Sequence, residues 1–233
     1  MADSPISVAF SKVQDLPEAA KSGLPAAERE RADSFKAAQR RDQYLCARAL
    51  LRALLQRYTG NPAKSHELGS DDKGKPVCAG GPAISIAHSG GIVMCAAAPH
   101  GEIGIDIEIP NLRHNIDGIA ARYFAAEESA WLATQPEDRF FMLWVLKEAW
   151  LKAEGTGIAG GLDRLRCVVT PPAIDAHVSS GVSPLLSLYA LDDALIGIAT
   201  QSAAHENLAI ELWDPQSGLF DSDCGALFVA ATG

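Results

Sequence analysis

The chain has 233 residues and a formal net charge of −9, and 48% of its residues are hydrophobic and 21% charged. This composition supports one large domain or two small ones with a real core, and it excludes general disorder. The acidic balance argues against nucleic-acid binding, which requires a basic surface.

Cysteine usage and the lack of long apolar runs indicate the compartment. The five cysteines include no CxxC pair, which predicts free thiols in a reducing environment and neither a disulfide framework nor a zinc site: Cys46, Cys78, Cys95, Cys167 and Cys224. The N-terminus has no basic start followed by an apolar run, and the longest apolar stretch, around residues 92–99, is too short for a bilayer. We therefore expect a soluble cytoplasmic protein without membrane contact.

The first part of the chain predicts a strand, a long helical region and a group of strands. The helical region, residues 29–58, lacks Gly and Pro and is compatible with two helices broken near Arg40. A Gly- and Pro-rich stretch at 69–82 predicts an exposed loop. The predicted strands are residues 6–10, a hairpin of 84–88 with 92–98, and 102–109.

The second part follows a connector at residues 110–115 and repeats the order of helices before strands. The predicted helices are 116–124, 127–134 and 137–154, and the predicted strands are 165–170, 185–191, 196–200 and 208–213. The tail after Pro215 is weakly patterned. We expect two α+β halves, residues 1–110 and 111–233, although periodicity alone does not establish a duplication.

Two acids on one predicted strand stand out. Asp106 and Glu108 lie two residues apart in an isoleucine run, so both carboxylates share a face. Most isolated pairs of this kind are simply solvated, but Gly104 beside them leaves room for a close approach. Glu148, on a predicted helix, offers a third carboxylate, and three such groups suit a hard divalent cation such as Mg²⁺ with phosphate oxygens as further ligands.

The helix of Glu148 carries Trp144 and Lys152 one turn before and one turn after it. A surface ion pair between Glu148 and Lys152 is the simpler interpretation. Trp144 and Trp150, however, indicate that part of the helix is buried, and a buried acid needs a partner or a metal.

The N-terminal half holds candidates for anion binding. Lys75 lies in a Gly-Lys-Pro turn, where a solvated lysine is the usual finding. His88 ends an apolar strand and precedes Ser89, so it is either a core histidine with a backbone partner or a phosphate ligand beside Ser89 and the following amides. The helical region 29–52 is rich in arginine, which fits either solvated ion pairs or an anion site.

Five segments in this order resemble the Sfp-type phosphopantetheinyl transferases: G-K-P at 74–76, S-I-A-H-S at 85–89, G-I-D-I-E at 104–108, R-Y-F-A-A-E-E at 122–128 and W-V-L-K-E-A-W-L-K at 144–152. The likeness runs from about Pro25 to about Leu165. It implies an α+β fold in which two similar α/β halves form a pseudo-dimer within one chain, the 4′-phosphopantetheinyl transferase fold, and hence a monomer.

The resemblance implies a reaction and roles for the residues. In this family 4′-phosphopantetheine passes from coenzyme A to a serine of an apo acyl or peptidyl carrier protein, with Mg²⁺, and 3′,5′-ADP leaves. The metal ligands would be Asp106, Glu108 and Glu148, and Glu148 would also take the serine proton, directly or through water. Lys152 would neutralise phosphate charge. Glu128 matches an acid that helps deprotonation or orders the site.

The same resemblance assigns coenzyme A contacts. Lys75, His88 and Ser89 would bind its phosphates, Arg31 matches a basic position near the 3′-phosphate, and Arg41 is a further candidate in that region. Ala87 departs from the family, which often has Ser there, so one hydroxyl contact is missing. The part beyond Leu165 carries no motif.

Other interpretations are weaker. A non-catalytic coenzyme A or carrier-binding module on the same scaffold would be expected to lose a metal acid or Lys152, and all are present. A generic Mg²⁺-dependent phosphotransferase lacks support because the chain has no P-loop or dinucleotide-binding glycine motif. Fatty-acid, polyketide and nonribosomal-peptide carriers all remain open. For carrier docking we expect the basic and apolar stretch that includes Arg113, His114, Ile116, Ile119 and Arg122; the alternative is that Ile116 and Ile119 simply pack into the core.

Overall fold

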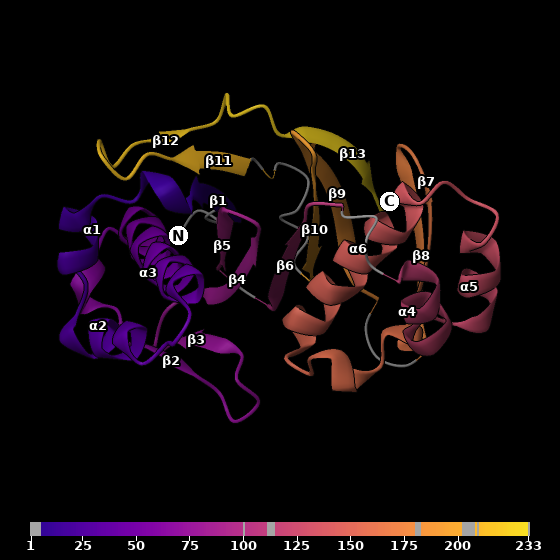
Figure 1. The fold of residues 1–233 in the computed structure, drawn as a ribbon, viewed down its shortest axis with the longest axis horizontal. Coiled ribbons are helices and arrows are strands. Elements are labelled where there is room, and N and C mark those ends of the chain that lie inside the picture. The colour runs from indigo at the N-terminus through magenta and orange to yellow at the C-terminus, as the bar shows by residue number, and fades with distance from the viewer. Residues whose placement is uncertain are drawn as a thin grey trace. The chain divides into compact units, whose positions relative to one another are not determined.

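The computed structural model describes residues 6–99, 101–110, 115–179, 183–201, 208 and 210–232. The chain divides into two compact units. Unit 1 comprises Met1–His100 with Ala204–Cys224, and unit 2 comprises Gly101–Ala203 with Gly225–Gly233. Each unit packs one long helix against a mixed sheet, so the predicted α+β fold class is confirmed (Figure 1).

Unit 1 is built on a five-stranded sheet in the order β12-β11-β1-β5-β4, with a separate β2-β3 pair. Its elements are β1 (Ser7–Lys12), α1 (Glu18–Ser22), α2 (Ala26–Asp33), α3 (Ala38–Thr59), β2 (Leu68–Ser70), β3 (Pro76–Cys78), β4 (Ala83–Ser89), β5 (Ile92–Ala98), β11 (Ile210–Trp213) and β12 (Phe220–Asp221). The predicted hairpin of β4 and β5 is confirmed. Short 3₁₀ turns at Val13–Asp15 and Ala63–Ser65 connect the elements.

Helix α3 supplies the core of unit 1. It packs on β5 and β1 and buries four leucines completely: Leu50, Leu51, Leu54 and Leu55 (Figure 1). The helix ends at Gly60, whose φ of 72° is the left-handed conformation that glycine adopts at least cost. The predicted break of the helical region is confirmed, and it lies just before Ala38, where α3 begins.

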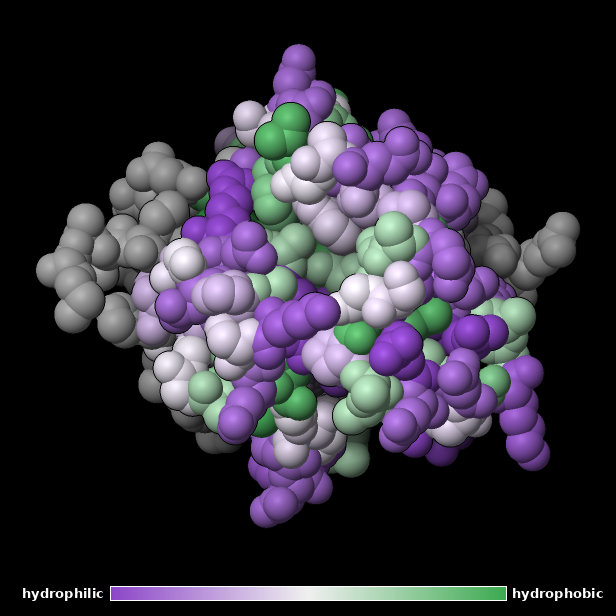
Figure 2. All heavy atoms as spheres, turned by 90° about the vertical axis from the view of Figure 1, so that its left-hand side faces the viewer, coloured by the Kyte–Doolittle hydropathy of each residue, from purple (hydrophilic) through white to green (hydrophobic). Residues whose placement is uncertain are grey.

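The side of unit 1 that carries α1 and α2 is mainly hydrophilic (Figure 2). Hydrophobic residues on this face form small separate groups rather than one continuous patch. The face therefore has the character of an ordinary solvated surface, and its arginines and carboxylates determine its chemistry.

Unit 2 is built on a six-stranded sheet in the order β6-β10-β9-β13-β8-β7. Its elements are β6 (Ile103–Glu108), α4 (Ile116–Tyr123), α5 (Ala126–Leu132), α6 (Asp138–Glu154), β7 (Leu165–Thr170), β8 (Ala173–Val178), β9 (Leu185–Leu191), β10 (Ala194–Thr200) and β13 (Leu227–Ala231). Two 3₁₀ turns, Ile158–Gly160 and Leu162–Arg164, follow α6. The strands β8, β12 and β13 carry no clear sequence signal, and β7 and β9 match their predicted bounds.

The predicted boundary after Pro110 is corrected by the sheet pairing. Strand β6 joins unit 2, because it pairs antiparallel with β10 along its whole length. The tail also crosses the predicted boundary, since β11 and β12 belong to unit 1 and β13 to unit 2. Sequence order suggested that β6 continues the hairpin before it, but strand partners are chosen by long-range packing.

Helix α6 lies unusually close to the sheet of unit 2 because two strands carry glycine beneath it. A Cβ on Gly104 of β6 would lie 1.9 Å from the carbonyl oxygen of Ala149, and one on Gly197 of β10 would lie 2.3 Å from that of Val145. The room that Gly104 provides is therefore occupied by the backbone of α6 and not by a ligand. This corrects the sequence-based expectation for Gly104 and fixes the height of α6 above β6 (Figure 1).

Two further expectations concern the cysteines and the apolar segments. All five cysteines are free thiols, and all except Cys224 are buried, as predicted. Among the described residues, no helix is both long and apolar enough to cross a membrane.

Candidate active site

The site is assembled within unit 2, where β6 passes beneath α6. Gly104 contacts the α6 backbone, so Asp106, two residues further along the strand, points to the same helix. In the sheet register Asp106 lies opposite Gly197 of β10, which also contacts α6. A glycine-lined strip of sheet thus brings the backbone of α6 close to the Asp106 carboxylate.

Asp106 is buried and ion-paired. Its residue is only 6% exposed, and Lys152 Nζ donates to its Oδ1 at 2.7 Å. The simple alternative of a solvated acidic strand face is therefore wrong for Asp106. The predicted surface pair between Glu148 and Lys152 is also replaced, because the ammonium of Lys152 contacts the strand acid.

Glu148 has an altered acidity. Burial raises the pKa of its carboxyl from an ordinary 4.5 to about 7; the charge of Asp106 adds to the rise, Lys152 lowers the pKa, and Glu108 raises it slightly. Its Oε1 is buried and accepts no hydrogen bond among the described atoms. Such an orphaned carboxylate oxygen is costly unless a cation or a proton occupies the position beside it.

The three predicted metal ligands do not form a closed cluster. Nowhere in the described ranges do three His, Cys, Asp or Glu side chains gather closely enough to hold a metal ion. Glu108, at the end of β6, is only partly buried, and it affects Glu148 as the weakest of the three neighbouring charges. The donor set nevertheless fits Mg²⁺, because it offers carboxylate oxygens, one of them orphaned, at a position where negative charge accumulates.

Glu128 lies in a different environment from the other acids. Its Oε2 accepts from the fully buried Nζ of Lys147 at 2.8 Å, and its Oε1 accepts from the amide of Cys167 at 2.8 Å. Lys147 also donates to the carbonyl oxygens of Leu162 and Leu165. Both oxygens of Glu128 are thus engaged in joining α5, α6 and β7, an arrangement that orders the helix carrying Glu148.

The predicted phosphate ligands lie in unit 1. Lys75 precedes β3 in a tight loop, where its amide and that of Lys73 donate to Asp71 Oδ1 at 2.8 and 2.9 Å. His88 is exposed near the end of β4, so the alternative of a core histidine is wrong. Ser89 is partly buried beside the turn at Gly90, whose carbonyl accepts from Gln43 of α3 at 3.0 Å. The loop and the strand end are therefore held in place by local hydrogen bonds.

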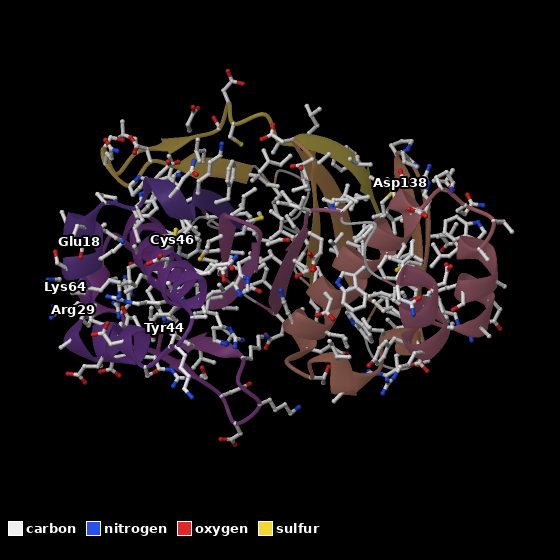
Figure 3. The ribbon with its side chains drawn as sticks, viewed as in Figure 1. Glu18, Arg29, Tyr44, Cys46, Lys64 and Asp138 are labelled. Atoms are coloured by element: carbon white, nitrogen blue, oxygen red, sulfur yellow. The ribbon has the colours of Figure 1, made fainter. Side chains whose placement is uncertain are left out.

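The two predicted arginines lie near the junction of α2 and α3. The Arg31 guanidinium stands 5.2 Å from the centre of the Phe35 ring, and Arg41 pairs with Asp33 at 3.2 Å. Arg41 also lines a hollow of about 220 Å³ together with Arg29 and Glu18. Figure 3 labels Glu18 and Arg29, which lie on the side of unit 1 that carries α1 and α2. Both arginines are exposed, so their charges are accessible to an anion.

The predicted docking stretch is described only in part. Arg113 and His114 lie outside the described residues. Ile116 and Ile119 of α4 are partly buried and pack against the core of unit 2, so they do not form a free apolar stripe. Arg122 lies over the ring of its neighbour Tyr123, with 5.1 Å between guanidinium and ring centre.

Buried Lys147 is the residue of this region that the sequence interpretation missed. It is 0% exposed, yet it lies directly beside Glu148 in the chain. The sequence contained a signal, because Leu143 and Leu151, one helical turn before and after Lys147, are apolar. In the structure both leucines are fully buried. A lysine between two such positions on one helix face predicts a buried cation that needs an acid.

Two family models match the chain. The 4′-phosphopantetheinyl transferase N-terminal domain matches residues 28–98, and the 4′-phosphopantetheinyl transferase superfamily matches residues 102–181. The first match covers most of the described part of unit 1, and the second covers β6, α6 and the residues between them.

Several named proteins are similar to the chain. The 4′-phosphopantetheinyl transferase HetI of Nostoc sp. (strain PCC 7120) is 28% identical over 204 residues, which is 84% of each chain. The 4′-phosphopantetheinyl transferase of Bacillus subtilis is 29% identical over 162 residues, 67% of this chain and 70% of that protein. The L-aminoadipate-semialdehyde dehydrogenase-phosphopantetheinyl transferase of Homo sapiens is 28% identical over 169 residues, 64% of this chain and 53% of that protein.

Proposed function

The chain belongs to the 4′-phosphopantetheinyl transferase superfamily, and we propose that it transfers 4′-phosphopantetheine from coenzyme A to a serine of an apo carrier protein, with unit 2 supplying the reacting groups. The assignment of the reacting groups rests on one observation. Asp106 of β6 contacts Lys152 of α6 and interacts electrostatically with Glu148 of the same helix. Two acids and one lysine are what a phosphoryl transfer between two anionic partners requires, namely charge neutralisation and a base.

The proposed step replaces a phosphoanhydride bond with a phosphate ester bond. The serine Oγ attacks the β-phosphorus of coenzyme A, the bond from that phosphorus to the bridging oxygen breaks, and the bridging oxygen leaves with 3′,5′-ADP. Glu148 accepts the proton of the serine hydroxyl, directly or through a water. Burial raises the pKa of this carboxyl to about 7 in the protein without metal, so the group is more basic there than an ordinary carboxylate.

We propose that Asp106, Glu108 and Glu148 hold Mg²⁺, which when bound would neutralise charge on the pyrophosphate oxygens. Lys152 would add a single positive charge on the same side of the reacting phosphate. It is suited to this because its side chain is 31% exposed and ends in a mobile ammonium. Glu128 would act indirectly, by fixing α6 through Lys147.

Coenzyme A recognition is proposed for unit 1. Lys75, His88 and Ser89 would contact phosphates, with Arg31 and Arg41 at the 3′-phosphate. The exposure of His88 and of both arginines supports this role, because a phosphate ligand must be reachable. Arg41 would have to exchange Asp33 for the phosphate, which costs little because exposed ion pairs are weak.

The deciding experiment incubates the protein with apo carrier proteins, coenzyme A and Mg²⁺, and follows the carriers by intact-mass spectrometry. The expected result is a gain of one phosphopantetheine group at the carrier serine. Asp106→Asn should reduce the rate about 10²–10³-fold, the loss typical for removing one charge-stabilising group. A wild-type protein that binds coenzyme A but modifies no carrier would favour the non-catalytic binding module instead. Carriers of fatty-acid, polyketide and nonribosomal-peptide origin should be compared in parallel, since the carrier class is open.

A further inference from the structure

The contact between Lys152 and Asp106 joins two groups that the proposed reaction uses separately. The Nζ to Oδ1 distance is 2.7 Å, and the Asp106 side chain is 9% exposed while that of Lys152 is 31% exposed. A buried carboxylate requires a compensating cation. In the protein without metal, the ammonium of Lys152 supplies that charge.

The neighbouring acid lacks such a partner. Oε1 of Glu148, one helical turn before Lys152 on α6, is buried and accepts no hydrogen bond from the described residues. The ammonium of Lys152 therefore lies in a region that offers more than one carboxylate. A divalent cation would satisfy both acids, but the ammonium already lies against one of them.

We propose that Lys152 is an internal counter-ion that holds the place of the metal, so that a divalent cation must displace its ammonium from Asp106 in order to bind. This rests on the proposed function, which places the metal at Asp106, Glu108 and Glu148. The partly exposed, flexible lysine stem permits the ammonium to move outward while its backbone stays in α6. Once displaced, the ammonium is available to an anionic substrate, so metal binding prepares the site for the pyrophosphate.

The inference predicts an unusual pair of effects from one substitution. Lys152→Met removes both the competitor for Asp106 and a repelling positive charge, so the affinity for a divalent cation should rise, by about tenfold within the range usual for coupled sites. Transfer activity should fall, because the lysine is lost for the phosphate. A lysine that repels the metal but does not compete with it for Asp106 would give a rise in affinity that does not depend on Asp106.

The test measures Mn²⁺ binding by electron paramagnetic resonance on metal-stripped protein without coenzyme A. The proteins are the wild type, Lys152→Met, Lys152→Gln as a second neutral variant, and Lys12→Met as a control for the loss of an exposed lysine in unit 1. Thermal unfolding of each variant establishes that it is folded. Both Lys152 variants should bind Mn²⁺ about tenfold more tightly than the wild type and the control.

A double-mutant cycle ties the effect to its partner. In an Asp106→Asn background the ammonium no longer competes for Asp106 and only its repulsion of the metal remains, so adding Lys152→Met should tighten Mn²⁺ binding clearly less than it does in the wild type. Unchanged or weaker Mn²⁺ binding by the Lys152 variants, or the same tightening without Asp106, would overturn the counter-ion role and leave the transferase assignment intact. No Mn²⁺ binding by any of the proteins would remove the metal site itself, a different failure that the same titration reveals.

Discussion

The acidity of Glu148 is set by its surroundings and gives the site a measurable pH dependence. Burial raises its pKa from 4.5 to about 7, and Asp106 adds to the rise. Because the pKa of this carboxyl is higher in the folded state than in the unfolded state, the folded state binds the proton more tightly. Protonated Glu148 therefore contributes to the free energy of unfolding. That contribution is complete below about pH 4.5 and is lost as the pH rises through about 7.

We therefore expect Glu148→Gln to gain stability relative to the wild type as the pH rises. In buffers with a chelator, the melting temperatures of the two proteins should differ least near pH 4.5 and most above pH 7. The exposed acid Glu30 offers a matched control, and Glu30→Gln should follow the wild type throughout. A constant difference between wild type and Glu148→Gln across this range would show that the carboxyl titrates normally.

The elements of unit 2 depend on the close approach of α6 to β6. Gly104→Ala would place a Cβ 1.9 Å from the Ala149 carbonyl oxygen, and neither backbone can move without disturbing the sheet or the helix. We expect a loss of about 1–3 kcal/mol in the free energy of unfolding. Activity should fall further than stability, because α6 carries Glu148 and Lys152. Gly91→Ala is the control, since nothing lies within 4 Å of the added Cβ there and its φ is not positive. Equal stability of the two variants in urea titrations would disprove the packing argument.

The Lys147–Glu128 pair belongs to the same scale, since it joins three elements. Lys147→Met leaves Glu128 as a buried acid without its cation, and we expect a loss of about 3–5 kcal/mol in unfolding free energy. The double variant Lys147→Met with Glu128→Gln should recover part of that loss. For Glu128→Gln, both the free energy of unfolding and the turnover per folded molecule should be measured, because a purely structural residue changes only the first. If Glu128→Gln is fully folded but its turnover drops like that of Asp106→Asn, Glu128 takes part directly in the chemistry.

At the scale of the whole molecule, the end of the chain completes both units. Strand β11 pairs in parallel with β1 in unit 1, while β13 is an internal strand of the unit 2 sheet, beside β9 and β8. A chain ending at Thr200 therefore lacks one strand neighbour in each sheet. We expect it to lose cooperative thermal unfolding, whereas a chain ending at Thr232 keeps it. Cooperative unfolding of the shorter chain by calorimetry would contradict the role assigned to these strands.

The sequence alone determined the elements with strong periodicity and the residues of the motifs. Helix α6, the β4–β5 hairpin and the adjacent acids of β6 follow from local patterns, because period and turn residues act over a few positions. The order of motifs indicated the family, which the family models confirm. The sequence did not reveal that His88 is exposed or that β8 and β13 are strands, since burial and strand pairing depend on neighbours distant in the chain.

Only the tertiary structure decided which groups meet. The sequence around Asp106 does not predict that β6 pairs with β10 or that Lys152 contacts Asp106 rather than Glu148. It also does not predict the ion pair between Glu128 and the buried Lys147. These outcomes follow from two glycines that lower α6 onto the sheet and from the cost of burying a charge without an opposite one. The sequence names the acids and the lysines, whereas packing and desolvation choose their partners and thereby set the pKa of Glu148.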